Sequence, residues 1–324
     1  MAFRNPPSIR RSPLFVRQHL SLSLANFCQH TQSRAFFSLP LESKLKAPHP
    51  AEAWHHRGYS TVGQEKVSLY PDPITGVMSS GAVPTFECKE SFDIGRDEND
   101  LLTPNIWPPD DLVPGFREAN VRLFETLRAT AMQVLAALAL GMGLPDERFF
   151  DRSHSARGCA NQLRLLHYPP VERAALQTGE KERIVAHTDK GTITLLLQED
   201  DGVGGLEVEA EVDAGQREFV AAPAVPGAVL VNIGDLLQMW SNDVLRSTRH
   251  RVGLPPSPPS PAVLGEAEAD DGTVDRRFSV AYFVAVDRDT IVDCLEPCHG
   301  PDRPKKYPPV PAWDYITKAM SAAY

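Results

Sequence analysis

Cysteine is scarce in this chain, and its pattern excludes two kinds of small-domain architecture. The 324 residues include five scattered cysteines, an odd number, with no C-x-x-C pair. A disulfide framework needs paired cysteines, and a zinc ribbon needs two close pairs. The sequence therefore predicts a protein that is stabilised by its core and keeps its thiols reduced.

The sequence also lacks long apolar runs and an excess of basic residues. No apolar stretch approaches the roughly 18 residues that span a bilayer, which argues against a membrane protein. The net charge is −9, from 33 basic and 42 acidic residues, whereas nucleic-acid binding requires a basic face. We therefore expect a monomer whose partner is a small organic molecule, with no nucleic acid and no membrane.

The first 41 residues differ in composition from the rest. They contain five arginines and several serines, and no acidic residue precedes Glu42. This composition is typical of a mitochondrial transit peptide. The alternative is a first helix whose apolar residues, between Leu20 and Phe37, pack on the domain. We expect a cytoplasmic protein, with a mitochondrial location as the alternative.

The periodicity of apolar residues changes near residue 158. Between Leu112 and Gly143 they recur at steps of three and four, which predicts one long amphipathic helix. Short segments with strand-like alternation follow, without intervening helices, and such a series indicates a sandwich or jelly roll. The expected strands are 162–168, 183–187, 192–198, 206–208, 219–222, 228–233 and 278–286.

The predicted fold class is α+β, with a double-stranded β-helix (jelly-roll) core and flanking N-terminal helices. We expect a helical N-terminal region over residues 1–157 and the jelly-roll domain over residues 158–324. Residues 253–276 are rich in proline and then acidic. Proline removes ladder donors, and the acidic part has little apolar surface to bury. This segment is therefore expected to be an exposed insertion between two strands.

The pair His187 and Asp189 is the first candidate site. Residues i and i+2 of a strand project to one face, so both side chains come within reach of one ion. His250 is the best third ligand. Two histidines and one carboxylate form the facial triad of non-haem Fe(II) oxygenases, which leaves coordination positions open. An isolated H-x-D pair is more often a histidine beside a helix-capping aspartate, so further support is needed.

Arg277 and Ser279 form a second candidate site. They stand two residues apart at the start of an expected strand and so share one face. An inward guanidinium beside a hydroxyl forms a clamp for a carboxylate, because arginine makes two parallel charge-assisted hydrogen bonds. The alternative is an ordinary ion pair between Arg277 and the acidic segment.

Several longer stretches carry a resemblance to a known family. The chain is similar to the Fe(II)- and 2-oxoglutarate-dependent dioxygenases of the isopenicillin N synthase-like type, especially those of fungal secondary metabolism. The resemblance extends from Phe36 to the end of the chain. Matching stretches include HRGY at 56–59, NIWP at 105–108, LRLLHYPP at 163–170, GGLEV at 204–208 and NIGDLLQMWSN at 232–242.

The resemblance implies an oxidoreductase that uses Fe(II), 2-oxoglutarate and O2. It would hydroxylate, desaturate or rearrange a small organic molecule, in secondary-metabolite biosynthesis. The implied iron ligands are His187, Asp189 and His250. The implied 2-oxoglutarate-binding residues are Arg277 and Ser279, for the distal carboxylate, and Tyr168.

The chain departs from the family pattern at several places. Leu166 stands where many relatives carry an asparagine, so one cosubstrate contact is expected to be absent. The Arg-x-Ser motif follows the last histidine at an unusual distance, consistent with the insertion. Residues 1–35 do not show the family's opening strand, so the N-terminal region is expected to be shortened. Tyr59 and Phe86 are candidates for the substrate pocket.

Two alternatives to this function stay open at the level of sequence. An Fe(II) oxidase of the isopenicillin N synthase type would use the same triad without 2-oxoglutarate, and its Arg-Ser pair would bind another carboxylate. A non-catalytic barrel would hold a structural metal such as zinc at the same residues.

Overall fold

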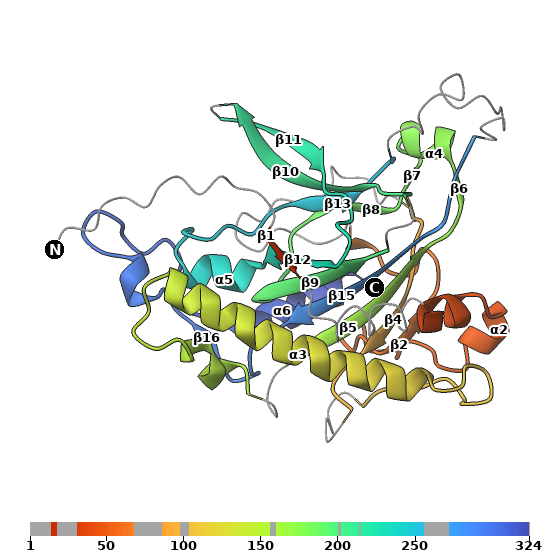
Figure 1. Cartoon of the computed structure of the whole chain (residues 1–324), viewed down its shortest axis with the longest axis horizontal. Helices are drawn as coiled ribbons and strands as arrows, with labels where there is room; N and C mark the ends of the chain where they lie inside the picture. The colour runs from red at the N-terminus through yellow and green to blue at the C-terminus, as the bar shows by residue number, and fades with distance from the viewer. Residues whose placement is uncertain are drawn as a thin grey trace.

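Two antiparallel sheets form the body of the protein, and the smaller sheet lies across one face of the larger (Figure 1). The computed structural model describes residues 14–17, 31–67, 86–97, 104–155, 160–199, 202–213, 215–255 and 272–323. The large sheet has the order β1-β12-β9-β15-β5-β4-β2, and the small sheet β11-β10-β13-β8. This arrangement is the expected jelly roll.

The strands of the large sheet are β1 (Leu14–Arg17), β2 (Gly58–Ser60), β4 (Glu90–Ile94), β5 (Gln162–Tyr168), β9 (Ile193–Gln198), β12 (Ala228–Ile233) and β15 (Arg277–Val284). Those of the small sheet are β8 (Ile184–His187), β10 (Leu206–Asp213), β11 (Gln216–Ala221) and β13 (His250–Val252). Short pairs link β3 (Phe86–Glu87) to β7 (Lys181–Glu182), β6 (Val171–Glu172) to β14 (Thr273–Val274), and β16 (Ile291–Val292) to β17 (Val310–Pro311).

Helices cover the sheets and close their ends. The helices include α2 (Leu41–Lys44), α3 (Phe116–Gly141), α4 (Arg173–Gln177), α5 (Asp235–Trp240) and α6 (Ala312–Ala322), with 3-10 turns η2 (Phe149–Ser153) and η4 (Glu296–Cys298). All seven expected strands are present, and the main differences lie at their ends. Short strands such as β13 were missed at the sequence level because three residues carry little periodicity.

The long helix α3 runs beside the large sheet and supplies much of the core (Figure 1). It begins at Phe116, later than Leu112, because Gly115 has φ of 75° and forms a left-handed N-cap. Phe124 packs edge-on against Tyr282 of β15, with ring centroids 5.1 Å apart. By length and apolar composition alone, this helix could cross a membrane. Its buried apolar face against the sheet is that of a core helix in a globular domain.

The N-terminal part of the chain contributes strands as well as helices. β4 pairs with β5, and β2 pairs with β4, so the large sheet crosses the boundary that the sequence suggested near residue 158. β1 pairs with β12, so a strand does lie within the first 35 residues, where none was expected. A four-residue strand at a sheet edge leaves too short a pattern to be recognised.

Two expected features lie largely outside the described residues. Of the Arg-rich N-terminal segment, only residues 14–17 and 31–41 are described, and residues 31–37 form a helix in which Phe36 and Phe37 are buried. Of the proline-rich and acidic segment, residues 256–271 are not described. Both expectations stay predictions.

Candidate metal centre and carboxylate clamp

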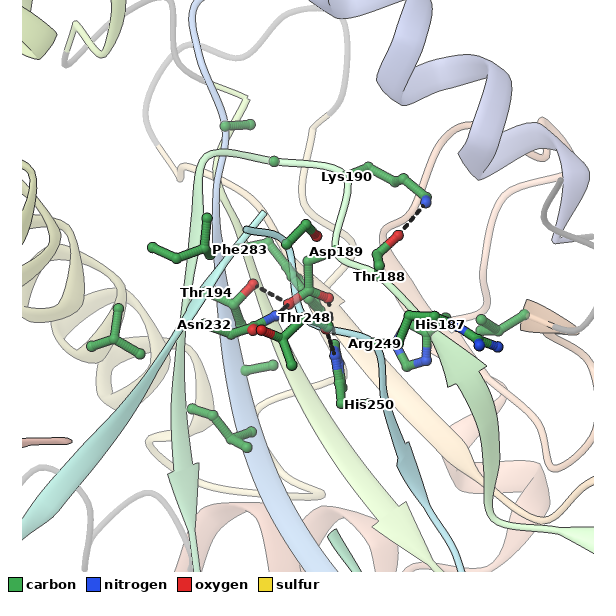
Figure 2. A pocket seen from close by; sticks show the side chains of 18 of the residues that line it. His187, Thr188, Asp189, Lys190, Thr194, Asn232, Thr248, Arg249, His250 and Phe283 are labelled. Atoms are coloured by element: carbon green, nitrogen blue, oxygen red, sulfur yellow. Dashed lines mark hydrogen bonds and ion pairs between the residues drawn. The ribbon is translucent and has the colours of Figure 1, made fainter. Parts of the chain in front are cut away.

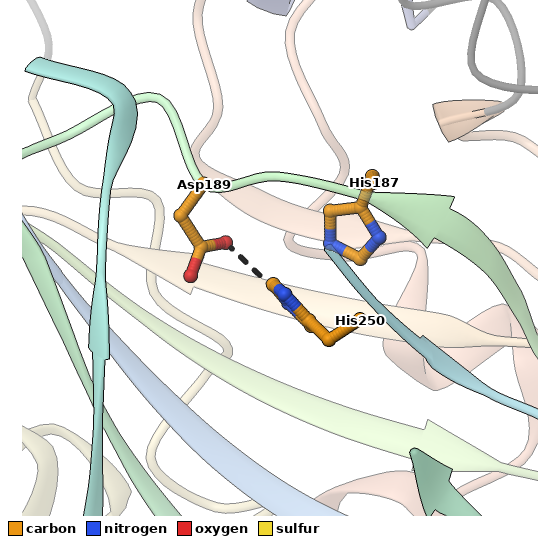
Figure 3. Close-up of side chains that lie close together, drawn as sticks. All are labelled: His187, Asp189 and His250. Atoms are coloured by element: carbon orange, nitrogen blue, oxygen red, sulfur yellow. Dashed lines mark ion pairs between the residues drawn. The ribbon is translucent and has the colours of Figure 1, made fainter. Parts of the chain in front are cut away.

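His187, Asp189 and His250 come together between two neighbouring strands of the small sheet (Figure 3). His187 ends β8, Asp189 lies two residues further along, and His250 begins β13. The register pairs His250 with His187, and their ring centroids are 4.4 Å apart. One ligand atom from each of the three residues lies within 4.8 Å of the others. The expected triad is therefore assembled.

Backbone hydrogen bonds orient both imidazoles toward the same point. Nδ1 of His187 lies 2.8 Å from the carbonyl of Val185, and Nδ1 of His250 lies 3.0 Å from the carbonyl of Thr248. A carbonyl only accepts, so each Nδ1 is the protonated nitrogen, which leaves Nε2 with a free electron pair in the neutral ring. Burial, followed by the charge of His250, lowers the pKa of His187 to about 3. A neutral imidazole is the form that binds a metal ion.

The carboxylate of Asp189 is held equally firmly (Figure 2). Its Oδ2 accepts hydrogen bonds of 2.7 Å from both Thr194 and Asn232, and its Oδ1 lies 3.7 Å from Nε2 of His250. Burial alone would raise the pKa of Asp189, but the two histidines and these hydrogen bonds hold it below its ordinary value. Two imidazoles and one carboxylate, each fixed by an outer hydrogen bond, suit a divalent transition metal.

Arg277 and Ser279 form the second site, on the large sheet. Arg277 is buried, and its guanidinium donates to the Ser279 hydroxyl at 3.0 Å and to the Gln198 side-chain oxygen at 3.1 Å. Tyr168 lies opposite Arg277 in the β5–β15 register, with its ring centroid 5.2 Å from the guanidinium carbon. The structure thus brings the three expected residues together. Gln198 was missed, because only the β9–β15 register places it beside Ser279.

One cavity of about 840 Å³ joins the two sites. It lies between the sheets, and His187, Asp189, His250, Arg277 and Ser279 all line it. Leu166 lies opposite Ser279 in the register and presents an apolar side chain to the cavity, as its departure from the family pattern implies.

The two substrate-pocket candidates named from the sequence were wrong. The Tyr59 side chain is buried and donates a hydrogen bond to Glu90, and Phe86 is half exposed. Neither belongs to the cavity lining. Apart from the clamp residue Tyr168, the lining takes aromatic rings from Trp54, Phe283 and Trp313. These three come from distant parts of the chain, which explains why no sequence pattern grouped them.

A buried ionic cluster forms the cavity wall beside β5, and sequence reasoning missed it as well. Arg164 pairs with Asp93 at 2.6 Å and with Glu65 at 2.7 Å, and Lys89 pairs with Glu65 at 2.6 Å. Nη2 of Arg164 lies 3.0 Å from Nδ1 of His56, which must therefore accept the hydrogen bond. The cluster holds the N-terminal segments against the jelly roll.

His56 is expected to make the protein sensitive to acid. Burial, followed by the charge of Arg164, lowers its pKa from 6.5 to about 4. The unfolded chain then binds a proton more readily than the folded one. The contribution of neutral His56 to the free energy of unfolding is fully present above pH 6.5. It is lost as the pH falls toward 4, at up to about 1.4 kcal/mol per pH unit. Urea unfolding of wild type and His56→Asn between about pH 7.5 and 4.5, across this interval, should show a shallower slope for the variant. His299→Asn, outside the cluster, serves as control, and parallel slopes for all three proteins would contradict the assignment.

Comparison with known proteins places the chain in a family. The profile of the 2OG-Fe(II) oxygenase superfamily matches residues 159–285, and that of the non-haem dioxygenase in morphine synthesis N-terminal region matches residues 28–110. The proline hydroxylase buaE of Petromyces alliaceus is 40% identical over 293 residues, which cover 90% of this chain and 83% of the relative. This chain belongs to the 2OG-Fe(II) oxygenase superfamily.

Further relatives of this dioxygenase agree with that membership. The 2-oxoglutarate-dependent dioxygenase htyE of Aspergillus rugulosus is 39% identical over 269 residues, 82% of this chain and 75% of the relative. A Neurospora crassa protein, whose crystal structure holds alpha-KG and thymine, is 31% identical, with a TM-score of 0.78 over 96% of this chain and 87% of that one. The protein is thus a 2-oxoglutarate- and Fe(II)-dependent oxidoreductase, and the 2-oxoglutarate-independent alternative is not favoured.

Proposed function

We propose that His187, Asp189 and His250 are the Fe(II) ligands of this dioxygenase. The supporting observation is their orientation: both Nε2 atoms and one carboxylate oxygen converge, and each residue is fixed by hydrogen bonds through its other polar atom. Three protein ligands leave the remaining positions of an octahedral ion to 2-oxoglutarate and O2. Bound there, Fe(II) would couple the oxidative decarboxylation of 2-oxoglutarate to the oxidation of a substrate C–H bond.

In this proposal Arg277, Ser279 and Tyr168 bind the far carboxylate of 2-oxoglutarate. The guanidinium of Arg277 donates to the neutral acceptors Ser279 and Gln198, and an arriving carboxylate would offer it two parallel hydrogen bonds between ionised groups. Ser279 and the phenol of Tyr168 flank the guanidinium on the neighbouring positions of β15 and β5. Leu166 and the other apolar side chains between the two sites would cover the methylene groups of the cosubstrate.

We further propose that the substrate is a small molecule with a carboxylate, such as an amino acid. The described cavity lining contains ten arginine or lysine side chains and five carboxylates, in a protein whose net charge is −9. Two of the carboxylates are paired within the lining, Glu209 with Arg217 and Arg249, and Asp243 with Lys306. Because basic side chains outnumber carboxylates, the lining has a net positive charge. An anionic ligand would be drawn into such a cavity. The relative named proline hydroxylase acts, by its name, on a compound of this class.

Substrate-dependent succinate release tests this proposal. The protein with Fe(II), 2-oxoglutarate and ascorbate is incubated with L-proline and other amino acids, and separately with thymine, the neutral ligand in the Neurospora crassa structure. We expect an amino acid to raise succinate release and to gain one oxygen atom by mass spectrometry, with a KM that rises with salt. Turnover of thymine with none of the carboxylate compounds would overturn the proposed substrate class and leave the iron assignment intact.

The proposal also covers the setting in which the enzyme works. We propose a monomer that acts in the cytoplasm without nucleic acid or membrane, with a mitochondrial location as the alternative. The acidic net charge supports the absence of nucleic-acid binding, and the Arg-rich, acid-free start of the chain supports the mitochondrial alternative. Sedimentation of the purified protein and microscopy of a C-terminal fluorescent fusion would test both.

A further inference from the structure

One carboxylate oxygen of Asp235 joins three elements of the fold. Asp235 begins α5 and is 3% exposed. Its Oδ2 accepts from the Thr188 hydroxyl at 3.0 Å, the Lys190 ammonium at 2.8 Å and the Tyr315 hydroxyl at 2.9 Å. Thr188 and Lys190 are the two neighbours of Asp189 in the chain, whereas Tyr315 belongs to α6. The same oxygen therefore connects the turn of a proposed iron ligand to the C-terminal helix.

The backbone reinforces the connection on the side of the metal centre. The amide of Asp235 donates to the carbonyl of Asp189 at 2.8 Å, and the amide of Leu236 donates to the carbonyl of Gly191 at 3.1 Å. Contact is so close here that a Cβ on Gly234 would lie 2.2 Å from the Gly191 carbonyl oxygen. A displacement of the start of α5 is therefore passed directly to the turn that carries Asp189.

The C-terminal helix α6 forms part of the cavity wall. Trp313, Ile316 and Met320 line the cavity from spacings of three and four residues, which place them along one side of the helix. Trp313 also packs edge-on against Trp54, with ring centroids 6.1 Å apart. At the far end, the carbonyl of Ala323 accepts from the amide of Lys66 at 2.8 Å. How α6 is seated thus affects the shape of the space beside the metal centre.

We propose that Asp235 is a positioning residue that couples the seating of α6 to the placement of Asp189. This inference rests on the proposed iron site. Tyr315 and the pair Thr188–Lys190 donate to the same oxygen of Asp235. Loss of the hydrogen bond from Tyr315 therefore shifts the carboxylate relative to Thr188 and Lys190, and loss of a bond from that pair shifts it relative to Tyr315. A bound substrate that contacts the α6 residues of the cavity lining would in this way change the position of Asp189.

Hydrogen exchange of the protein with Co(II) and 2-oxoglutarate tests the coupling. Tyr315→Phe removes only the hydroxyl contributed by α6. We expect amide exchange to rise roughly tenfold in 312–322 and also in 187–191, with a shift of the visible Co(II) absorption. Thr188→Val removes the hydroxyl that donates to Asp235 from the turn of Asp189, and it should raise amide exchange in α6. Tyr307→Phe is the matched control, because the Tyr307 hydroxyl donates to Asp243 and accepts from Gln238 of α5, so its loss perturbs α5 without removing a hydrogen bond to Asp235.

The outcomes separate the coupling from the proposed function. Faster exchange in 312–322 alone, with an unchanged Co(II) spectrum, would make Tyr315 a local anchor and overturn the inference. The inference would also fail if Tyr307→Phe perturbed 187–191 to the same extent as Tyr315→Phe. Failure of the wild-type protein to bind Co(II) would refute the proposed iron site, and the exchange comparison in the metal-free protein would still decide the coupling.

Discussion

Alanine at His187, Asp189 or His250 is expected to abolish both Fe(II) binding and 2-oxoglutarate turnover. Each residue supplies one of three converging ligand atoms, and two protein ligands do not hold the ion in the required geometry. Loss of an outer-shell partner of a metal ligand already weakens binding by about 10–100-fold, so loss of a ligand should cost more than about a hundredfold. Anaerobic Fe(II) titration, with succinate release measured in parallel, provides both readouts.

His299→Ala is the matched control for the histidine variants. His299 lies directly after η4 and does not line the cavity. It should bind Fe(II) as the wild type does. Normal succinate formation by His250→Ala would remove this residue from the ligand set. Tight zinc binding that persists without any 2-oxoglutarate turnover would instead favour a structural metal site.

Arg277→Ala is expected to raise the KM for 2-oxoglutarate by roughly 10–100-fold. A hydrogen bond to a charged group contributes about 1.5–3 kcal/mol, and Arg277 would make such bonds to the far carboxylate of the cosubstrate. The value of kcat at saturating 2-oxoglutarate should change far less, because the two histidine ligands belong to the small sheet and Arg277 to the large one. Arg277→Lys should recover part of the loss, since lysine keeps the charge without the planar fork.

Arg217→Ala supplies the comparison for these arginine variants. Arg217 also lines the cavity but pairs with Glu209 at 3.1 Å on the small sheet. Its removal should leave the KM for 2-oxoglutarate unchanged. An unaltered KM in Arg277→Ala would place the cosubstrate carboxylate elsewhere. Oxygen uptake by the wild type without 2-oxoglutarate would point to the oxidase mode of the isopenicillin N synthase type.

Local geometry explains which parts of the site the sequence could predict. His187 and Asp189 stand two residues apart at the end of a strand, and Arg277 and Ser279 have the same spacing at the start of one. Within a strand this spacing puts Arg277 and Ser279 on one face, whatever the rest of the chain does. Asp189 lies in the turn after β8, so its approach to His187 also depends on the path of that turn. The jelly roll likewise follows from short alternating segments without intervening helices, because period and length are properties of the local sequence.

Longer-range contacts needed the tertiary structure. Gln198 joins the clamp through the β9–β15 register, and Arg164 meets Glu65 and Asp93 from segments far apart in the chain. A strand register depends on the packing of whole faces, so no local pattern reveals it. The prediction that Tyr59 and Phe86 line the substrate pocket was wrong for this reason. Aromatic residues are common in pockets, but packing places both side chains outside the cavity lining.

The sequence by itself determined the fold class, because strand period is a local property, and it indicated the chemistry through its resemblance to a known family that carries the H-x-D and R-x-S pairs. Only the tertiary structure decided how these pieces meet: His250 opposite His187, and Asp235 between the metal turn and Tyr315 of α6. These contacts join residues dozens of positions apart. Their geometry depends on close packing and shared hydrogen-bond acceptors, which exist only once the chain has folded.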